Sequence, residues 1–142
     1  MILGIGVDLV EVARFRSWAH APQQRLRRVF SAQELNDCRL ADQTYDPTKL
    51  ASRFAAKEAV FKALSATLIN LKKTQQTFSL LTLCRLVDVT APVWGVPVLI
   101  VDWKALEAII HQPIPSLTVH LSLSHEQACA VAYVVIELQD KQ

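Results

Sequence analysis

Apolar residues alternate strictly with other residues at two places in the chain, which predicts β-strands there. In Ile2–Val10 one face carries Leu3, Ile5, Val7 and Leu9, and the other carries Gly4, Gly6, Asp8 and Val10. In Leu117–Leu123 we expect Leu117, Val119, Leu121 and Leu123 to face inward, with Thr118, His120, Ser122 and Ser124 on the other face. Because Gly4 and Gly6 have no side chains, the face around Asp8 is bare. Glycine inside a strand often marks close approach by another backbone or a ligand.

The remaining apolar runs predict three further strands. Ala128–Leu138 is an almost unbroken apolar run, which fits a strand buried on both faces. Phe78–Thr90 and Val98–Val101 are also expected to be strands. Because sheets rarely leave a strand isolated, the N-terminal strand should pair with the C-terminal strands.

The middle of the chain has helical periodicity. Pro47–Leu68 predicts a long helix whose core stripe, at 100° per residue, contains Leu50, Phe54, Phe61, Leu64 and Leu68. Ser31-x-x-Glu34 is a capping box, so another helix should start near Ala32. Shorter helical segments are expected at Glu11–Ala19, Gln23–Phe30 and Trp103–His111. A strand, a helical block and then several strands make an α+β fold, with the helical block packed on a mainly antiparallel sheet.

Composition narrows the class of protein. A chain of 142 residues, 51% hydrophobic and 20% charged, fits a single domain over 1–142 with a real core. The net charge of +2 is too small to indicate nucleic acid, and no apolar run reaches the length of a membrane span. The N-terminus lacks the basic region of a signal peptide. Cys38, Cys84 and Cys129 are odd in number and widely spaced, which indicates reduced thiols in a cytoplasmic protein.

The long helix carries the first candidate site. Glu58 and Lys62 are four residues apart at the edge of its core stripe, and Ala51 and Ala55 leave a bare patch on the same flank where a ligand could approach. The alternative is an ordinary surface pair contributing about 0.3–0.5 kcal/mol. Lys57 projects about 20° from Leu50, into the apolar stripe, so it either extends out to solvent or reaches a buried partner.

Asp8 and Glu58 are the two candidate metal ligands. Mg²⁺ is usually held by one or two carboxylates together with substrate phosphates. Lys62 could then neutralise a phosphate oxygen, as is typical of phosphoryl-type transfer. The spacing does not show that Asp8 and Glu58 meet, and Asp8 could instead end its strand or cap the next helix.

Five arginines form a basic cluster between residues 14 and 28: Arg14, Arg16, Arg25, Arg27 and Arg28. Such a run is often a solvated helical face. The functional alternative is a docking surface for an acidic partner, with association that salt weakens.

Several other chemistries are not supported. The chain has no P-loop and no G-x-G-x-x-G between a strand and a helix. Ser124 and His125 are adjacent, which is not the arrangement of a catalytic triad. Four histidines without suitable spacing or cysteine partners make a zinc site improbable on sequence grounds.

Three motifs resemble those of the holo-acyl-carrier-protein synthases, the short bacterial-type 4'-phosphopantetheinyl transferases. They are Gly4–Phe15 (GIGVDLVEVARF), Arg53–Ala63 (RFAAKEAVFKA) and His120–His125 (HLSLSH). They occur in the family's order and spacing. The resemblance implies an α+β fold of that family and Mg²⁺-dependent transfer of 4'-phosphopantetheine from coenzyme A to a serine of apo-acyl carrier protein. Adenosine 3',5'-bisphosphate is released, and the product serves fatty acid biosynthesis.

The resemblance also assigns roles to the residues of the first two motifs. Asp8 and Glu58 would be the metal ligands. Glu58, or a metal-bound water, would help to deprotonate the carrier serine. Lys62 would bind coenzyme A and stabilise charge, or donate a proton, at the leaving phosphate.

Further contacts are implied for coenzyme A, for the carrier protein and for other copies of the chain. Arg53, Ser124 and His125 would lie near coenzyme A. Arg14 and Arg28 would bind the acidic recognition helix of the carrier. Short members of the family form homotrimers with active sites between subunits, so a trimer is expected here.

The chain departs from the family in its middle. The glycine-rich loop that usually follows the second motif is replaced by residues 65–74, which contain no glycine, and the Asn-Gly-Lys-Pro turn is replaced by Val93–Pro97. These are interpreted as tolerated loop changes that leave any role of Lys72 and Lys73 open. Two alternatives remain: a non-catalytic domain that binds a carrier through its arginines, and the same transfer onto a carrier domain of a polyketide or peptide synthetase.

Overall fold

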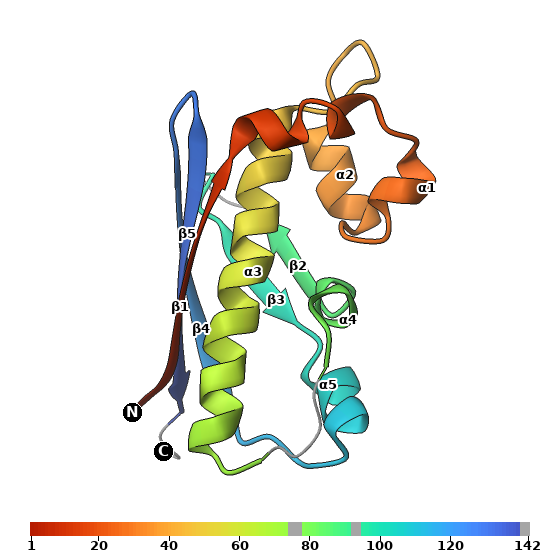
Figure 1. Cartoon of the computed structure of the whole chain (residues 1–142). Coiled ribbons are helices and arrows are strands. Elements are labelled where there is room, and N and C mark those ends of the chain that lie inside the picture. Colours follow the sequence, from red (N-terminus) through yellow and green to blue (C-terminus); the bar gives the residue numbers. More distant parts are fainter. Residues whose placement is uncertain (74–77, 92–94, 140–142) are drawn as a thin grey trace.

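The structure, a computed structural model, describes residues 1–73, 78–91 and 95–139. In chain order its elements are β1 (Ile2–Glu11), the 3₁₀ turns η1 (Val12–Phe15) and η2 (Trp18–His20), α1 (Gln23–Leu26), α2 (Ala32–Cys38), α3 (Pro47–Asn70), α4 (Leu80–Cys84), β2 (Val87–Thr90), β3 (Val98–Val101), α5 (Trp103–Ile110), β4 (Leu117–His125) and β5 (Cys129–Leu138). The α+β fold is therefore confirmed (Figure 1).

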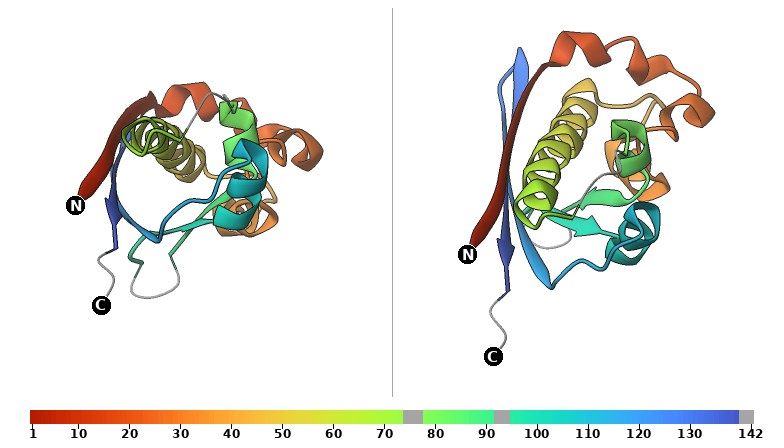
Figure 2. Two further views of the ribbon diagram at one scale, coloured as in Figure 1. Left: turned by 90° about the horizontal axis from the view of Figure 1, so that it is seen from below. Right: turned by 60° about the horizontal axis from the view of Figure 1, so that its bottom comes forward.

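The main sheet joins the two ends of the chain. Its strand order is β1-β5-β4 and both pairs are antiparallel, so the predicted pairing of the N-terminal strand is confirmed. Helix α3 crosses one face of this sheet, and β2 and β3 form a second antiparallel pair, next to β4, that also packs against α3 (Figures 1 and 2). Both sheets thus pack against α3, which carries the candidate residues Arg53, Glu58 and Lys62.

The glycine face of β1 lies directly against α3. A Cβ atom built on Gly4 would overlap the carbonyl oxygen of Ala63, and one on Gly6 would overlap that of Ala59. The glycines therefore permit close approach, as predicted, and the approaching backbone is that of α3. Asp8, two residues further along the same face, is brought to the same helix.

The apolar face of β1 points away from α3. Ile5, Val7 and Leu9 are 50%, 51% and 65% exposed, whereas Leu3 is buried because the register shifts between Ile2 and Gly4. The expectation that β5 is buried on both faces is wrong. One face is fully buried, but Tyr133 on the other is 46% exposed. In the described part of the chain, no helix covers this side of the sheet (Figure 2).

The predicted strand Phe78–Thr90 is wrong over its first half. Ser79 accepts a hydrogen bond from the Thr82 amide and caps the helix α4, so only Val87–Thr90 is a strand. A serine at a helix N-cap satisfies an otherwise unpaired amide, and this local bond overrides the strand-like composition.

The bounds predicted for the other helical segments agree with the structure to different degrees. The Ser31–Glu34 capping box is present with both of its hydrogen bonds, and α3 extends two residues beyond its predicted end. The segment Glu11–Ala19 forms two 3₁₀ turns, and only the first half of Gln23–Phe30 is helical. The predicted helix Trp103–His111 is confirmed as α5 and ends one residue earlier. The segment Val93–Pro97, which replaces the family's Asn-Gly-Lys-Pro turn, falls partly outside the described residues.

Small side chains on α3 serve packing. Ala51 and Ala55 are fully buried in the protein core, so the predicted bare patch open to a ligand is wrong. Their small size lets other parts of the chain approach the helix closely.

Lys57 reaches a buried partner, which was one of the two outcomes expected from its place in the apolar stripe. It is fully buried, and its Nζ lies 3.0 Å from Oε2 of Glu34.

Candidate active site

Asp8, Glu58 and Lys62 meet where β1 crosses α3. Lys62 Nζ donates to Oδ1 of Asp8 at 2.8 Å and to the carbonyl of Val7 at 2.8 Å. Lys62 thus pairs with Asp8 across two elements, which rules out the simple helix-surface pair with Glu58. Asp8 neither ends its strand nor caps the next helix, since β1 continues to Glu11.

The two carboxylates are close enough to affect each other. Burial and the neighbouring Asp8 carboxylate raise the pKa of Glu58, against the opposing influence of Lys62 and Arg14. Desolvation and like charge both disfavour the ionised form of an acid. Glu58 is therefore a stronger base than an ordinary glutamate.

The Asp8 and Glu58 carboxylates fit a magnesium ion better than a metal that needs three or four protein ligands. Oδ2 of Asp8 is buried and has no hydrogen-bond partner, beside the Glu58 carboxylate. Within residues 1–73, 78–91 and 95–139, no group of three or more His, Cys, Asp or Glu side chains could hold a metal ion. Two carboxylates, with other oxygens from water and substrate, are the usual protein share of a Mg²⁺ site.

We expect Glu58→Gln to raise the melting temperature in metal-free buffer at pH 7.5. The raised pKa means that the folded protein holds this proton more tightly than the unfolded chain, so ionised Glu58 disfavours folding. The gain in melting temperature should be largest above the pKa of Glu58 in the folded protein. It should fade as the pH falls to about 4.5, the ordinary pKa of glutamate. Thermal denaturation across this range measures it, with the exposed Glu126→Gln as control. A lower melting temperature at pH 7.5, or a gain that grows on acidification, would contradict the account.

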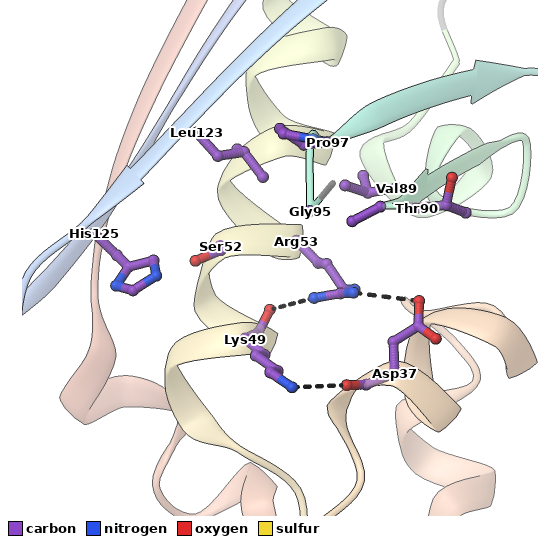
Figure 3. Close-up of a pocket in the computed structure, with 11 residues that line it drawn as sticks. Asp37, Lys49, Ser52, Arg53, Val89, Thr90, Gly95, Pro97, Leu123 and His125 are labelled. Atoms are coloured by element: carbon purple, nitrogen blue, oxygen red, sulfur yellow. Dashed lines mark hydrogen bonds and ion pairs between the residues drawn. The ribbon is translucent and has the colours of Figure 1, made fainter. Parts of the chain in front are cut away.

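A second site is a pocket of about 450 Å³ on the other side of α3. Its lining comes from α2, α3, β2, β4 and the segment before β3, and consists of Asp37, Lys49, Ser52, Arg53, Val89, Thr90, Ala91, Gly95, Pro97, Leu123 and His125 (Figure 3). It brings together two cations from α3, a histidine from the end of β4 and one carboxylate from α2. Such a lining suits a ligand that carries phosphate groups.

Arg53 is the central cation of this pocket. It forms an ion pair with Asp37 at 3.4 Å and a long hydrogen bond of 3.5 Å to the carbonyl of Lys49 (Figure 3). Its Nε atom is buried without a partner. The guanidinium therefore retains donor capacity for a ligand.

The structure separates the other residues predicted to bind coenzyme A. His125 lines this pocket with Arg53, whereas Lys62 lies with Asp8. Ser124 does not line the pocket and is exposed, since successive residues of a strand point to opposite faces.

Sequence reasoning missed Lys49 and Asp37. Lys49 could have been found, because it lies four residues before Arg53 and so on the same side of the helix. Asp37, Val89 and Thr90 come from other elements, and no local spacing links them to Arg53.

The arginine cluster is exposed, including the predicted partner-binding residues Arg14 and Arg28. Another pocket, of about 230 Å³, includes two of these arginines and is lined by Trp18, Arg25, Leu26, Arg28, Val29 and Leu81. The surface therefore combines positive charge with an apolar hollow.

Among the helices of the described residues, none is both long enough and apolar enough to cross a membrane.

Comparison with known proteins places the chain in a family. The model of the ACPS family, described as 4'-phosphopantetheinyl transferase superfamily, matches residues 4–92. A holo-acyl-carrier-protein synthase of Clostridium tetani (strain Massachusetts / E88) is 32% identical over 137 residues, covering 96% of this chain and 97% of that protein.

Solved structures agree with this placement. The ACPS–CoA complex of Chronobacterium ammoniagenes matches with a TM-score of 0.73 at 26% identity, covering 96% of this chain and 98% of that one. A holo-acyl-carrier-protein synthase from Bacillus anthracis str. Ames in complex with CoA (3',5'-ADP) matches with a TM-score of 0.66 at 27% identity, covering 98% and 99%. The chain therefore belongs to the ACPS family of the 4'-phosphopantetheinyl transferase superfamily.

Proposed function

We propose that this protein transfers the 4'-phosphopantetheine moiety of coenzyme A to a serine of apo-acyl carrier protein for fatty acid biosynthesis. The observation that carries the proposal is the meeting of Asp8, Glu58 and Lys62, which come from two motifs 50 residues apart in the chain. A domain that only bound a carrier would not need these three groups together. The test is incubation of the purified protein with coenzyme A, Mg²⁺ and apo-carrier, with the intact mass of the carrier as the readout.

Asp8 and Glu58 would hold the Mg²⁺ ion. When bound, the ion would neutralise charge on the diphosphate of coenzyme A. Glu58, whose pKa is raised, accepts the proton of the carrier serine hydroxyl. Lys62, whose side chain is 50% exposed, can leave Asp8 and place its charge on an oxygen of the leaving phosphate. The serine oxygen forms the new bond to phosphorus, and adenosine 3',5'-bisphosphate departs.

The pocket around Arg53 is proposed to bind the nucleotide end of coenzyme A. Arg53, Lys49 and His125 supply donors and positive charge for its phosphates. Arg53 and Glu58 are five positions apart on α3, hence about 140° apart around its axis. Strand β5 also separates Asp8 on β1 from His125 on β4. One coenzyme A would therefore use the pocket of one chain and the carboxylates of a neighbouring chain.

The open sheet face supports a homotrimer. Val7 lies opposite Tyr133 in the sheet, and both are about half exposed, as is Ile5. Exposed apolar patches of this kind mark interaction surfaces. We therefore propose that the three chains meet through this face.

We expect Val7→Asp to convert the trimer to monomer and to remove transferase activity, because it places a charge in the centre of the buried face. Light scattering after size exclusion measures the change from three times 15.9 kDa to one. Ile69→Asp, at an apolar residue of α3 that is 68% exposed against 51% for Val7, should remain trimeric. A Val7→Asp protein that is still trimeric would contradict the assigned interface.

The arginine cluster is proposed to bind the carrier. Arg14 and Arg28 would contact acidic side chains, and the hollow between Arg25 and Arg28 would take an apolar one. The charge of Arg14 also lowers the pKa of Glu58, which supports a docking surface close to the proposed base. We further propose a cytoplasmic, single-domain enzyme, which the three free thiols support.

A further inference from the structure

Helices α2 and α3 are linked by two ion pairs that lie side by side. Glu34 pairs with Lys57, and Asp37 pairs with Arg53. Glu34 and Asp37 are three residues apart, and Arg53 and Lys57 are four apart, so each pair of neighbours shares one side of its helix. The two links therefore run in parallel between the helices.

The two links differ in burial. Glu34 and Lys57 have no exposed side-chain surface, and their charged atoms are 3.0 Å apart. The outer link is longer, at 3.4 Å, and its Arg53 and Asp37 side chains are 12% and 28% exposed at the edge of the pocket. The outer link can be exchanged for a ligand, whereas the inner one is a fixed part of the core.

The inner link also holds strand β2. Lys57 Nζ donates to the carbonyl of Cys84 at 2.8 Å and to that of Val87, which are the last residue of α4 and the first of β2. Oε1 of Glu34 accepts from the Val89 amide at 2.9 Å. One buried pair thus fixes the backbone of α4 and β2 to both helices.

Strand β2 is a wall of the pocket. Val89 and Thr90 line it opposite Arg53, which lies one turn of α3 before Lys57. The position of β2 relative to α3 therefore sets the width of the pocket. Since hydrogen bonds inside a dry core resist displacement, the inner link keeps this width constant when the outer link opens.

We propose that Glu34 and Lys57 are positioning residues of the coenzyme A site: their buried pair holds β2 at a fixed distance from Arg53 and so sets the affinity for the nucleotide. This inference rests on the proposed function, because it takes coenzyme A as the ligand of the pocket. Neither residue touches the substrate, and neither contacts Asp8 or Lys62. The pair therefore acts on binding of coenzyme A rather than on the chemical step.

The double variant Glu34→Gln/Lys57→Met tests the proposal. It removes both charges at similar volume and leaves the β2 and α4 carbonyls without their lysine donor. We expect the KM for coenzyme A to rise roughly tenfold or more, with kcat unchanged. We also expect faster hydrogen exchange in residues 87–90. Leu68→Ala is the matched control, because it removes a buried side chain from the same helix far from β2.

The outcomes separate the possible roles. If Glu34 and Lys57 only stabilised the fold, the double variant would behave like Leu68→Ala, with an unchanged KM for coenzyme A in both. This result would overturn the proposal. Wild-type exchange in residues 87–90 of a folded double variant would overturn it as well. If the wild-type protein transferred nothing, the proposed function would fail, and the exchange measurement would still decide whether the pair holds β2.

Discussion

Asp8→Asn should lower kcat/KM for carrier modification by on the order of 10²–10³-fold while leaving the fold intact. The substitution keeps the shape of the side chain but removes the charge that faces both Lys62 and the proposed metal. Because Lys62 is half exposed, losing its partner should change the free energy of unfolding by about 1 kcal/mol or less. Activity and stability should therefore separate, and initial rates together with thermal denaturation measure both.

Two comparisons sharpen this prediction. Asp42→Asn removes an exposed carboxylate from the loop before α3 and should leave activity unchanged. Titration with Mg²⁺ or Mn²⁺ should show weaker metal binding in Asp8→Asn than in the wild type. Full activity of the Asp8 variant at low metal concentration would show that the carboxylate pair is not the metal site.

Lys57→Met should lower the free energy of unfolding by about 3–5 kcal/mol. The substitution leaves Glu34 buried without its opposite charge, and the pair is fully enclosed. A domain of this size has roughly 5–15 kcal/mol of stability in total, so the loss would be visible in any urea titration.

The cause of that loss can be checked through pH. Burial already raises the pKa of Glu34, and Lys57 is the first influence that opposes it. Without Lys57 the carboxyl should take up a proton in the folded state, so the loss should shrink as the pH falls from 7.5 toward 5. Glu34→Gln/Lys57→Met should recover the part of the loss that the unpaired Glu34 charge causes, but not the part caused by the lost lysine hydrogen bonds to Cys84 and Val87. A loss that is independent of pH and persists in full in the double variant would show that the unpaired charge is not its cause.

Two features of the candidate site were predictable from the sequence because their signals are local. The glycines before Asp8 announced a close approach, and i,i+4 spacing put Glu58 and Lys62 on one flank of a helix. The true partner of Lys62 was not predictable in this way, since Asp8 is 54 residues away in the chain. Its pairing depends on how β1 crosses α3.

The pocket around Arg53 and the buried Glu34–Lys57 pair were not predictable from local sequence patterns. The apolar surroundings of Lys57 indicated a buried partner or an escape to solvent, but Glu34 was visible only as a helix cap. Glu34 is both a helix cap and the buried partner of Lys57, because its two carboxylate oxygens accept from the Ser31 and Val89 amides and pair with Lys57. The bare patch at Ala51 and Ala55 was misread since small residues serve backbone packing as readily as ligand access.

The most direct test of the account is the intact mass of apo-acyl carrier protein after incubation with this protein, coenzyme A and Mg²⁺. We expect a gain of one phosphopantetheine, which is abolished by chelation of the metal and by mutating the acceptor serine of the carrier to alanine. The Asp42→Asn protein should give the same gain, and the Glu58→Gln protein should give almost none. An unmodified carrier, in an assay where a known synthase modifies it fully, would contradict the proposed transfer of phosphopantetheine by this protein.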